Sequence, residues 1–234
     1  LERFRADLAD GVSPDYAASR GEHFNGLLLA AWLDADFIDP AECIVIGSNG
    51  VVDPHTWNLL GERLAAEDRR FVVPGFYGRD AAGHVRTFSR GGSDVTGAIA
   101  ARAAGAALYE NWTDVSGLLM ADPRIVEHPR PMEEVTYAEI RELAYMGASV
   151  LHDEAMAPVR EVGIPVNIRN TNAPDHPGTR IVARLSDAVI HSTQIAGVAG
   201  KTGFCMITVG KNLMNREVGF VYRLLGVLEH NGIP

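Results

Sequence analysis

Residues 85–110 have the sequence VRTFSRGGSDVTGAIAARAAGAALYE, and this stretch decides the fold class. Its start predicts a strand, its glycine pair predicts a turn, and the alanine-rich residues 94–104 predict a helix with Ser93 as the N-cap. Residues 106–110 then predict a second, buried strand. A strand, a helix and another strand in this order are the repeating unit of an α/β protein.

The rest of the chain extends this alternation in both directions. Thr136 and Glu139 form a capping-box pattern that predicts a helix starting near residue 137, and Gly163 is a typical helix stop. A largely parallel sheet with helices on its faces is therefore expected. The other predicted helices cover residues 22–38, 155–162 and 217–229, and the other predicted strands cover residues 44–46, 71–73, 85–88, 165–168 and 204–209.

The composition describes an ordinary folded chain that acts on small molecules. The 234 residues are 47% hydrophobic, and 21 basic against 30 acidic residues give a net charge of −9, which argues against nucleic acid or an anionic membrane as a partner. No apolar run is long enough for a membrane span and the start shows no signal pattern, so we expect a cytoplasmic protein. Cys43 and Cys205 lie in apolar runs and are expected to be reduced core thiols.

The loop at residues 89–94 is the strongest candidate for a binding site. Its two glycines allow a ligand close to the backbone, the following helix start offers free N–H groups, and Arg90 fits a carboxylate or a phosphate. Asp94 is placed to influence transfer chemistry or to orient a cationic group. The alternative is a tight turn before a capped helix.

Other segments offer weaker signals. Thr113 and Asp114 follow a predicted strand, where α/β proteins bind ligands, and could contact a nucleotide. Residues 122–124 are either a surface turn or a loop that places Arg124 on phosphates. Residues 19–22 are either a cap before the first helix or a means to present Glu22 to an ammonium group.

Phe76, in the turn after the strand at residues 71–73, either lines a pocket or covers the core. The sequence has no P-loop, no dinucleotide-binding glycine motif and no cysteine and histidine spacing for zinc, so those three classes are disfavoured and no metal ligand is assigned.

Taken in order, these segments resemble the aspartate kinases of the amino-acid kinase family. The resemblance spans residues 19–182 and rests on the stretches SRGE, PGF, RGGSD, WTDVSG, DPR, GASVLH, IPV and PGT, in that order. It implies a three-layer α/β/α sandwich with a mainly parallel central sheet over residues 1–183. It further implies a linker at 184–202 and, at 203–234, the first part of an ACT regulatory domain.

The resemblance also implies an activity and a set of roles. The activity is transfer of the ATP γ-phosphate to the β-carboxylate of L-aspartate, giving 4-phospho-L-aspartate on the way to lysine, threonine and methionine, with Mg²⁺ bridging the phosphates. Asp94 would lie at the reacting end, and Arg90 would bind the aspartate carboxylate. The aspartate pocket would be completed by Glu22, Phe76, Thr87 and Ser93, and the nucleotide would be held by Thr113, Asp114, Leu119, Arg124 and Ser149.

The sequence departs from that family at several places. Ser149 stands where a lysine is usual, and Leu119 stands where an aromatic residue is common. The family's lysine-bearing N-terminal segment is absent from these 234 residues, so we expect this stretch alone to be inactive. A feedback amino acid, lysine or threonine, would bind at a homodimer or higher homo-oligomer interface through Met214, Glu217, Gly219 and Phe220.

Two other hypotheses remain open from the sequence. One is a different amino-acid kinase, acting on glutamate, acetylglutamate or UMP. The other is a non-catalytic amino-acid sensor that keeps the same fold.

Overall fold

The computed structural model describes residues 5, 9, 11–65, 68–146, 153–192, 195–200, 202–203, 207–210, 212 and 217–233. The chain divides into two compact units, Leu1–Gly200 and Lys201–Pro234. None of the helices in these ranges combines the length and apolar character needed to cross a bilayer.

Unit 1 begins its long first helix, α2 (Pro14–Leu33), earlier than the sequence predicted. Ser13 caps it, because the Ser13 hydroxyl accepts the Tyr16 N–H at 3.2 Å, and Pro14 occupies the first turn. The predicted start near residue 22 is wrong because the cap, and not the apolar spacing, sets the beginning of this helix. Residues 19–22 therefore lie inside α2 and do not cap it.

Short strands and helices follow α2. Residues 44–46, predicted as a strand, form only isolated bridges, because α3 takes up the residues before them and leaves too short a run. β1 pairs with β2 in parallel, and β3 pairs with β4 antiparallel. In chain order these elements are β1 (Asp36–Phe37), α3 (Pro40–Cys43), α4 (His55–Leu64), β2 (Phe71–Val72), β3 (Tyr77–Arg79), β4 (Val85–Thr87) and α5 (Gly92–Ala103).

The N-cap of α5 is Gly91, and the prediction of Ser93 is wrong. The φ of Gly91 is +56°, in the left-handed region that glycine adopts without steric cost. This turn brings the chain into helical geometry two residues before Ser93, which is the second residue of the helix.

A four-stranded sheet follows α5, with the order β5-β7-β8-β6. β5 pairs with β7 and β6 pairs with β8 in parallel, while β7 and β8 are antiparallel. β5 starts later than the predicted residues 106–110, because its register with β7 pairs Tyr109 with Val166. The elements are β5 (Tyr109–Thr113), β6 (Glu134–Thr136), α6 (Tyr137–Tyr145), η1 (Asp153–Met156), α7 (Ala157–Val162), β7 (Val166–Asn170) and β8 (Thr179–Val182).

Two local predictions in this half are confirmed. Thr136 and Glu139 form a complete capping box at the start of α6, each side chain bonding to the backbone of the other residue. Gly163 ends α7 with a φ of +73°.

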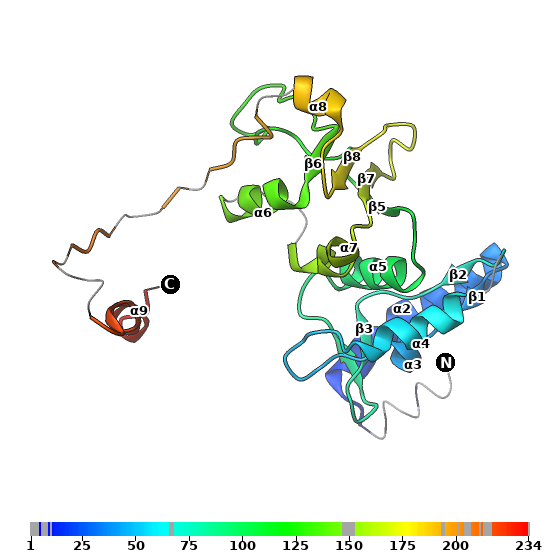
Figure 1. Ribbon diagram of the computed structural model, residues 1–234. Helices are drawn as coiled ribbons and strands as arrows, with labels where there is room; N and C mark the ends of the chain where they lie inside the picture. The colour runs from blue at the N-terminus through cyan, green and yellow to red at the C-terminus, as the bar shows by residue number, and fades with distance from the viewer. Residues whose placement is uncertain are drawn as a thin grey trace. The chain divides into compact units, whose positions relative to one another are not determined.

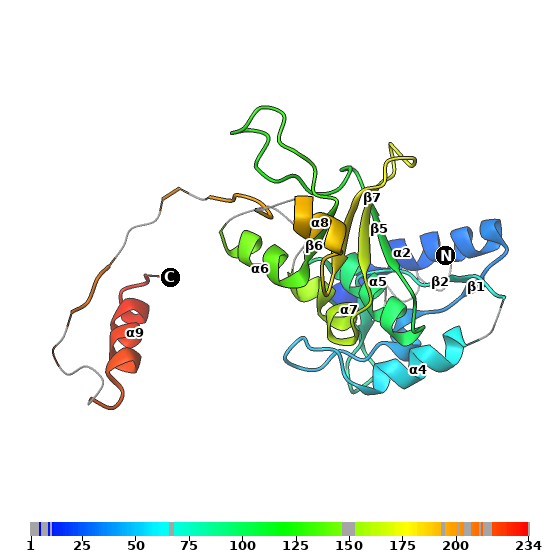
Figure 2. The ribbon, with the colours of Figure 1, turned by 45° about the horizontal axis from the view of Figure 1, so that its top comes forward.

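Helix α5 joins the two hydrophobic cores of unit 1. Ala98 and Ala101 pack into the core beneath the four-stranded sheet, and Ile99 packs into the core that also contains Ile44 and Leu60. Figures 1 and 2 show α5 beside α7 on one side and near α4 on the other. Since α5 is held by both cores, its N-terminus is a rigid place for a site.

Cys43 is fully buried in the second of these cores, as expected, and burial raises the pKa of its thiol to about 11. Cys205 lies outside the described residues.

The segment predicted as a linker is partly folded onto unit 1. It contains α8 (Asp187–Ser192), and the Val198 N–H donates to the Met120 carbonyl at 2.7 Å. In unit 2, α9 (Phe220–His230) is the predicted last helix, with Val221 and Leu225 exposed. Of the strand predicted at residues 204–209, residues 207–209 are not in a strand and the rest lie outside the described residues.

Candidate active site

The loop at residues 74–76 is the strained centre of the first candidate site, the set of residues predicted to hold the amino acid, which we call the first pocket. Phe76 has a φ of +60°, in a region that an aromatic residue rarely adopts, and such strain costs about 1–3 kcal/mol. The Phe76 N–H donates to the Thr96 hydroxyl at 3.1 Å, and its carbonyl accepts the Phe88 N–H at 2.9 Å. The hydrogen bonds to Thr96 and Phe88 hold the loop in this strained conformation. Backbone strain of this kind concentrates at functional sites.

The loop is wedged between α2 and the start of α5. A Cβ on Gly26 of α2 would lie 2.6 Å from Pro74 Cγ, and a Cβ on Gly92 of α5 would lie 2.5 Å from Phe76 Cβ. Both positions require glycine for this close approach. Glu22 lies one turn before Gly26 on the same face of α2, which is the face that packs against this loop.

The N-terminus of α5 forms the electropositive side of this neighbourhood. Arg90 is exposed and makes no ion pair with any of the described residues. Gly91 offers no side chain to cap the helix, and within the described ranges no backbone partner is found for the N–H groups of residues 92–94. Free amides, a helix N-terminus and an unpaired guanidinium together favour an anion.

Two other predicted residues of this pocket are placed differently. The Thr87 hydroxyl donates to Asp15 Oδ1 of α2 at 2.9 Å, so it ties β4 to the start of that helix. Ser93 is exposed at the first turn of α5 and faces the loop, since its atoms are the nearest that a Cβ on Gly75 would meet.

Asp94 is fixed towards β5. Asn111 Nδ2 donates to Asp94 Oδ1 at 2.8 Å, and the Tyr109 hydroxyl donates to the Asp94 carbonyl at 3.3 Å. Burial raises the pKa of Tyr109 to about 12, which keeps that donor protonated. Asn111 and Thr113 lie on the same face of β5, about 7 Å apart along the strand, so Asp94 is bonded to the strand that leads into Asp114, a residue of the second pocket.

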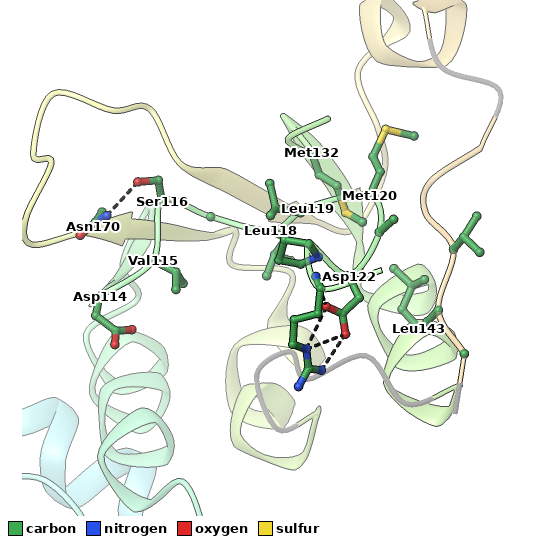
Figure 3. A pocket seen from close by; sticks show the side chains of 17 residues that line it. Asp114, Val115, Ser116, Leu118, Leu119, Met120, Asp122, Met132, Leu143 and Asn170 are labelled. Atoms are coloured by element: carbon green, nitrogen blue, oxygen red, sulfur yellow. Dashed lines mark hydrogen bonds and ion pairs between the residues drawn. The ribbon is translucent and has the colours of Figure 1, made fainter. Parts of the chain in front are cut away.

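The second pocket is a cavity of about 630 Å³, a size typical of small-molecule sites. Asp114, Ser116 and Asn170 lie at one end, and Met120, Met132 and Leu143 lie at the other (Figure 3). The Asn170 side chain donates to the Ser116 hydroxyl at 2.8 Å, which orders the polar end. A cavity with one polar and one apolar end suits a ligand with a charged part and a flat apolar part.

Arg124 lines this cavity but is already paired. Its Nε and Nη2 donate to the two oxygens of Asp122, at 3.0 Å and 2.6 Å, as Figure 3 shows around Asp122. This bidentate contact lowers the pKa of Asp122 to about 2. The Arg124 side chain is 83% exposed. Residues 122–124 thus form a turn at the surface, and this turn also places Arg124 in the lining of the cavity.

The other predicted nucleotide residues take separate positions. Leu119 lines the cavity and is bridged to Pro131 across the neighbouring segment. Thr113 is not part of the lining, although its hydroxyl lies 3.3 Å from Asp114 Oδ1. Ser149 lies outside the described residues.

Residues 198–200 form a further wall of the cavity. Val198 is hydrogen-bonded to Met120, and a Cβ on Gly197 would lie 2.7 Å from Met132 Cε. The end of unit 1 is therefore part of the pocket itself.

The predicted effector residues belong to unit 2. Glu217 forms an ion pair with Arg223, Gly219 is the N-cap of α9 with a φ of +76°, and Phe220 is the first residue of that helix. Met214 lies outside the described residues.

Sequence reasoning missed several residues of these pockets. Asn111 carried a usable signal, because an amide inside a buried strand needs a partner. The apolar cavity residues and Val198 carried none, since nothing local distinguishes them from core or connector. In the ranges that the structure covers, no three His, Cys, Asp or Glu side chains are grouped to hold a metal ion.

Comparison with known proteins gives one consistent result. A model of the amino acid kinase family matches residues 2–170, well over half of the chain. Aspartokinase 3 of Bacillus subtilis is 40% identical over an alignment of 253 residues that covers all of this chain and 54% of that protein.

Solved structures agree. An aspartate kinase of Clostridium acetobutylicum is 47% identical with a TM-score of 0.81, over 98% of this chain and 52% of that one. Aspartokinase III of E. coli in complex with aspartate and ADP is 29% identical with a TM-score of 0.67, over 76% of this chain and 43% of that one. This chain therefore spans about half the length of these relatives.

Proposed function

This chain belongs to the amino acid kinase family, and from that membership we propose that it is the catalytic part of an aspartate kinase. The observation that carries the proposal is the link between the two pockets. Asp94 lies in the first turn of α5, beside the first pocket, and its carboxylate is held by Asn111 of β5. Strand β5 leads directly into Asp114, which lines the second pocket. An acceptor in the first pocket and a donor in the second would meet at this link.

The first pocket suits an amino acid with two carboxylates. Arg90 and the free amides of residues 92–94 would bind one carboxylate, and Glu22 would bind the ammonium group. Phe76, Thr87 and Ser93 would complete the pocket. This division gives the α-carboxylate and the ammonium group of aspartate partners of opposite sign and leaves the β-carboxylate to react.

The second pocket suits the nucleotide. We assign the phosphates to the part of the cavity lined by Asp114 and Arg124, with Thr113 next to Asp114, and the flat base to the apolar part that includes Leu119. Ser149, outside the described residues, keeps its predicted place in this set. Mg²⁺ fits this end, because Asp114 offers an exposed carboxylate oxygen and magnesium is usually bound by one or two carboxylates together with substrate phosphates.

The reaction needs positioning and charge neutralisation more than proton transfer. A β-carboxylate oxygen of aspartate, ionised at neutral pH, attacks the γ-phosphorus, the bond from phosphorus to the β–γ bridging oxygen breaks, and ADP leaves with that electron pair. Magnesium, when bound, neutralises phosphate charge. Arg90 and the amides at the start of α5 hold the acceptor, while Asp94, fixed by Asn111, orients the groups at the reacting end.

The remaining expectations form part of the same proposal. We infer a catalytic domain at residues 1–183, a linker at 184–202 and an ACT-type regulatory start at 203–234, which the separate compact unit from Lys201 supports. Lysine or threonine would bind there through Met214, Glu217, Gly219 and Phe220 in a homo-oligomer. We also propose a cytoplasmic location, and the aspartyl phosphate would feed lysine, threonine and methionine synthesis.

The test measures the product directly. The full-length form is incubated with ATP, Mg²⁺ and aspartate, and aspartyl phosphate is trapped with hydroxylamine. We expect the trapped product with aspartate, much slower rates with glutamate, acetylglutamate or UMP, and loss of activity in Arg90→Ala. Arg180→Ala, which removes an exposed arginine of β8, is the matched control and should stay active. No trapped product, or full activity of Arg90→Ala, would refute the proposal.

A further inference from the structure

A partly buried polar cluster adjoins the strained loop through Tyr77, the residue that follows Phe76. Tyr77 is fully buried, and its hydroxyl donates to Asp39 Oδ1 at 3.0 Å. His23 Nδ1 lies 3.2 Å from the Tyr77 oxygen and 3.2 Å from Asp39 Oδ2. Asp39 also caps α3, accepting the Ala41 N–H at 3.0 Å. The Asp39 carboxylate thus bonds to Tyr77, to His23 and to the backbone of α3.

The donors and acceptors of this cluster assign every proton. A carboxylate only accepts, so the tyrosine hydrogen points to Asp39 and His23 carries its hydrogen on Nδ1. Burial lowers the pKa of His23, which keeps the ring neutral, and burial together with Asp39 raises the pKa of Tyr77, which keeps its hydroxyl protonated. The Asp39 carboxylate is therefore bonded to both neighbours without a second charge among the three residues.

Arg20 places a positive charge beside the cluster. The guanidinium of Arg20 lies over the rings of Tyr16 and Tyr77, with its carbon 4.5 Å and 5.5 Å from their centroids. It is only 7% exposed and also donates to the Ser19 hydroxyl at 3.0 Å. The Asp39 carboxylate and the Arg20 guanidinium thus both contact Tyr77, which holds the tyrosine between two groups of opposite charge.

The place of the cluster in the chain gives it a function. Tyr77 immediately follows Phe76, and His23 immediately follows Glu22, the two residues proposed on either side of the substrate. A fixed contact between Tyr77 and His23 through Asp39 therefore fixes the separation of the two substrate-binding elements. The close contact between Gly26 and Pro74 holds the same elements one turn further along α2.

We propose that Tyr77, His23 and Asp39 are positioning residues that set the affinity for the amino-acid substrate by fixing Phe76 relative to Glu22. The inference rests on the proposed function, because it names the aspartate pocket as the site that is set. None of the three residues needs to touch the substrate. Their effect should fall on the acceptor and leave the nucleotide cavity unchanged.

The first test is Tyr77→Phe in the full-length form. It removes one hydroxyl and keeps the ring, and we expect the KM for aspartate to rise about tenfold, with the KM for ATP unchanged and a smaller change in kcat. The matched control is Tyr137→Phe, which removes another buried hydroxyl, bonded to the Ile164 carbonyl at 2.5 Å, away from the loop in sequence. The control should lower stability and leave both KM values unchanged.

A second pair of variants keeps the test decisive if Tyr77→Phe fails to fold. His23→Asn keeps an N–H donor near the position of Nδ1 and should retain the KM for aspartate, whereas His23→Leu removes the donor and should raise it. Equal KM values for aspartate in His23→Asn and His23→Leu would overturn this inference and leave the proposed function standing. A rise in the KM for ATP that accompanies the rise in the KM for aspartate would do the same. Absence of aspartyl phosphate with the unsubstituted protein would overturn the proposed function and this inference with it.

Discussion

Gly92→Ala is the sharpest test of the wedged loop. The added Cβ would lie 2.5 Å from Phe76 Cβ and 2.8 Å from Phe76 Cα, whereas carbon atoms in contact are separated by about 3.5–4.0 Å. The loop must therefore retreat by about 1 Å, because α5 is held by both cores and cannot move instead. Overpacking of this kind costs about 1–3 kcal/mol.

Two measurements test the predicted loss of stability and the predicted shift of the loop in Gly92→Ala. A loss of about 2 kcal/mol should lower the Tm in circular dichroism by about 4–8 °C in a domain of this size. A shift of about 1 Å at Phe76 should lower kcat/KM for aspartate by about 100-fold, while the Kd for ATP in calorimetry stays the same. Gly226→Ala, whose new Cβ would meet open space outside its own helix among the residues that the structure describes, is the matched control and should preserve both values. Unchanged Tm and kcat/KM in Gly92→Ala would refute the close packing of Gly92 against Phe76.

Three further outcomes follow from the contacts of the two pockets. Asn111→Ala frees the Asp94 carboxylate, so kcat should fall at least about tenfold in the trapping assay while the protein stays folded. Asp122→Asn weakens the hold on Arg124, so the Kd for ATP should decrease in calorimetry, and an increase would contradict the pairing. His23 has a lowered pKa, so the unfolded chain binds its proton first and stability should fall as the pH drops below about 6.5; His23→Asn should flatten this part of a urea-unfolding series.

The sequence predicted the fold class well because α/β alternation is written in local patterns. The family comparison confirms the amino-acid kinase fold, and the capping box at Thr136 is an example of a signal complete within four residues. The start of α2 was missed although Ser13 and Pro14 are a standard beginning, because the apolar spacing further on was given more weight. The start of β5 was missed because its first residue is set by pairing with β7, which no local pattern reveals.

The site residues were predictable from sequence only where one short segment contains them. The loop with Arg90 and Asp94 combines glycines, a cation and a helix start, so its chemistry is visible in six residues. The cluster around Asp39 is different, because Tyr77 lies 54 residues after His23 and the hydrogen bond between them exists only after folding. Polar residues that act by supporting others leave no local mark.

The two ends of the proposed reaction differ in how ready their positive charge is. The acceptor end presents Arg90 and the amides of α5 without partners among the described residues, so it is prepared for an anion before any ligand arrives. The donor end presents Arg124 with its guanidinium already bound to Asp122. Since Arg124 is exposed to water, this pair is weakened by solvent screening, and a phosphate group of higher charge can replace the carboxylate at little cost. The pairing therefore orients Arg124 without blocking it, which gives a chain of net charge −9 local cations at both ends of the transfer.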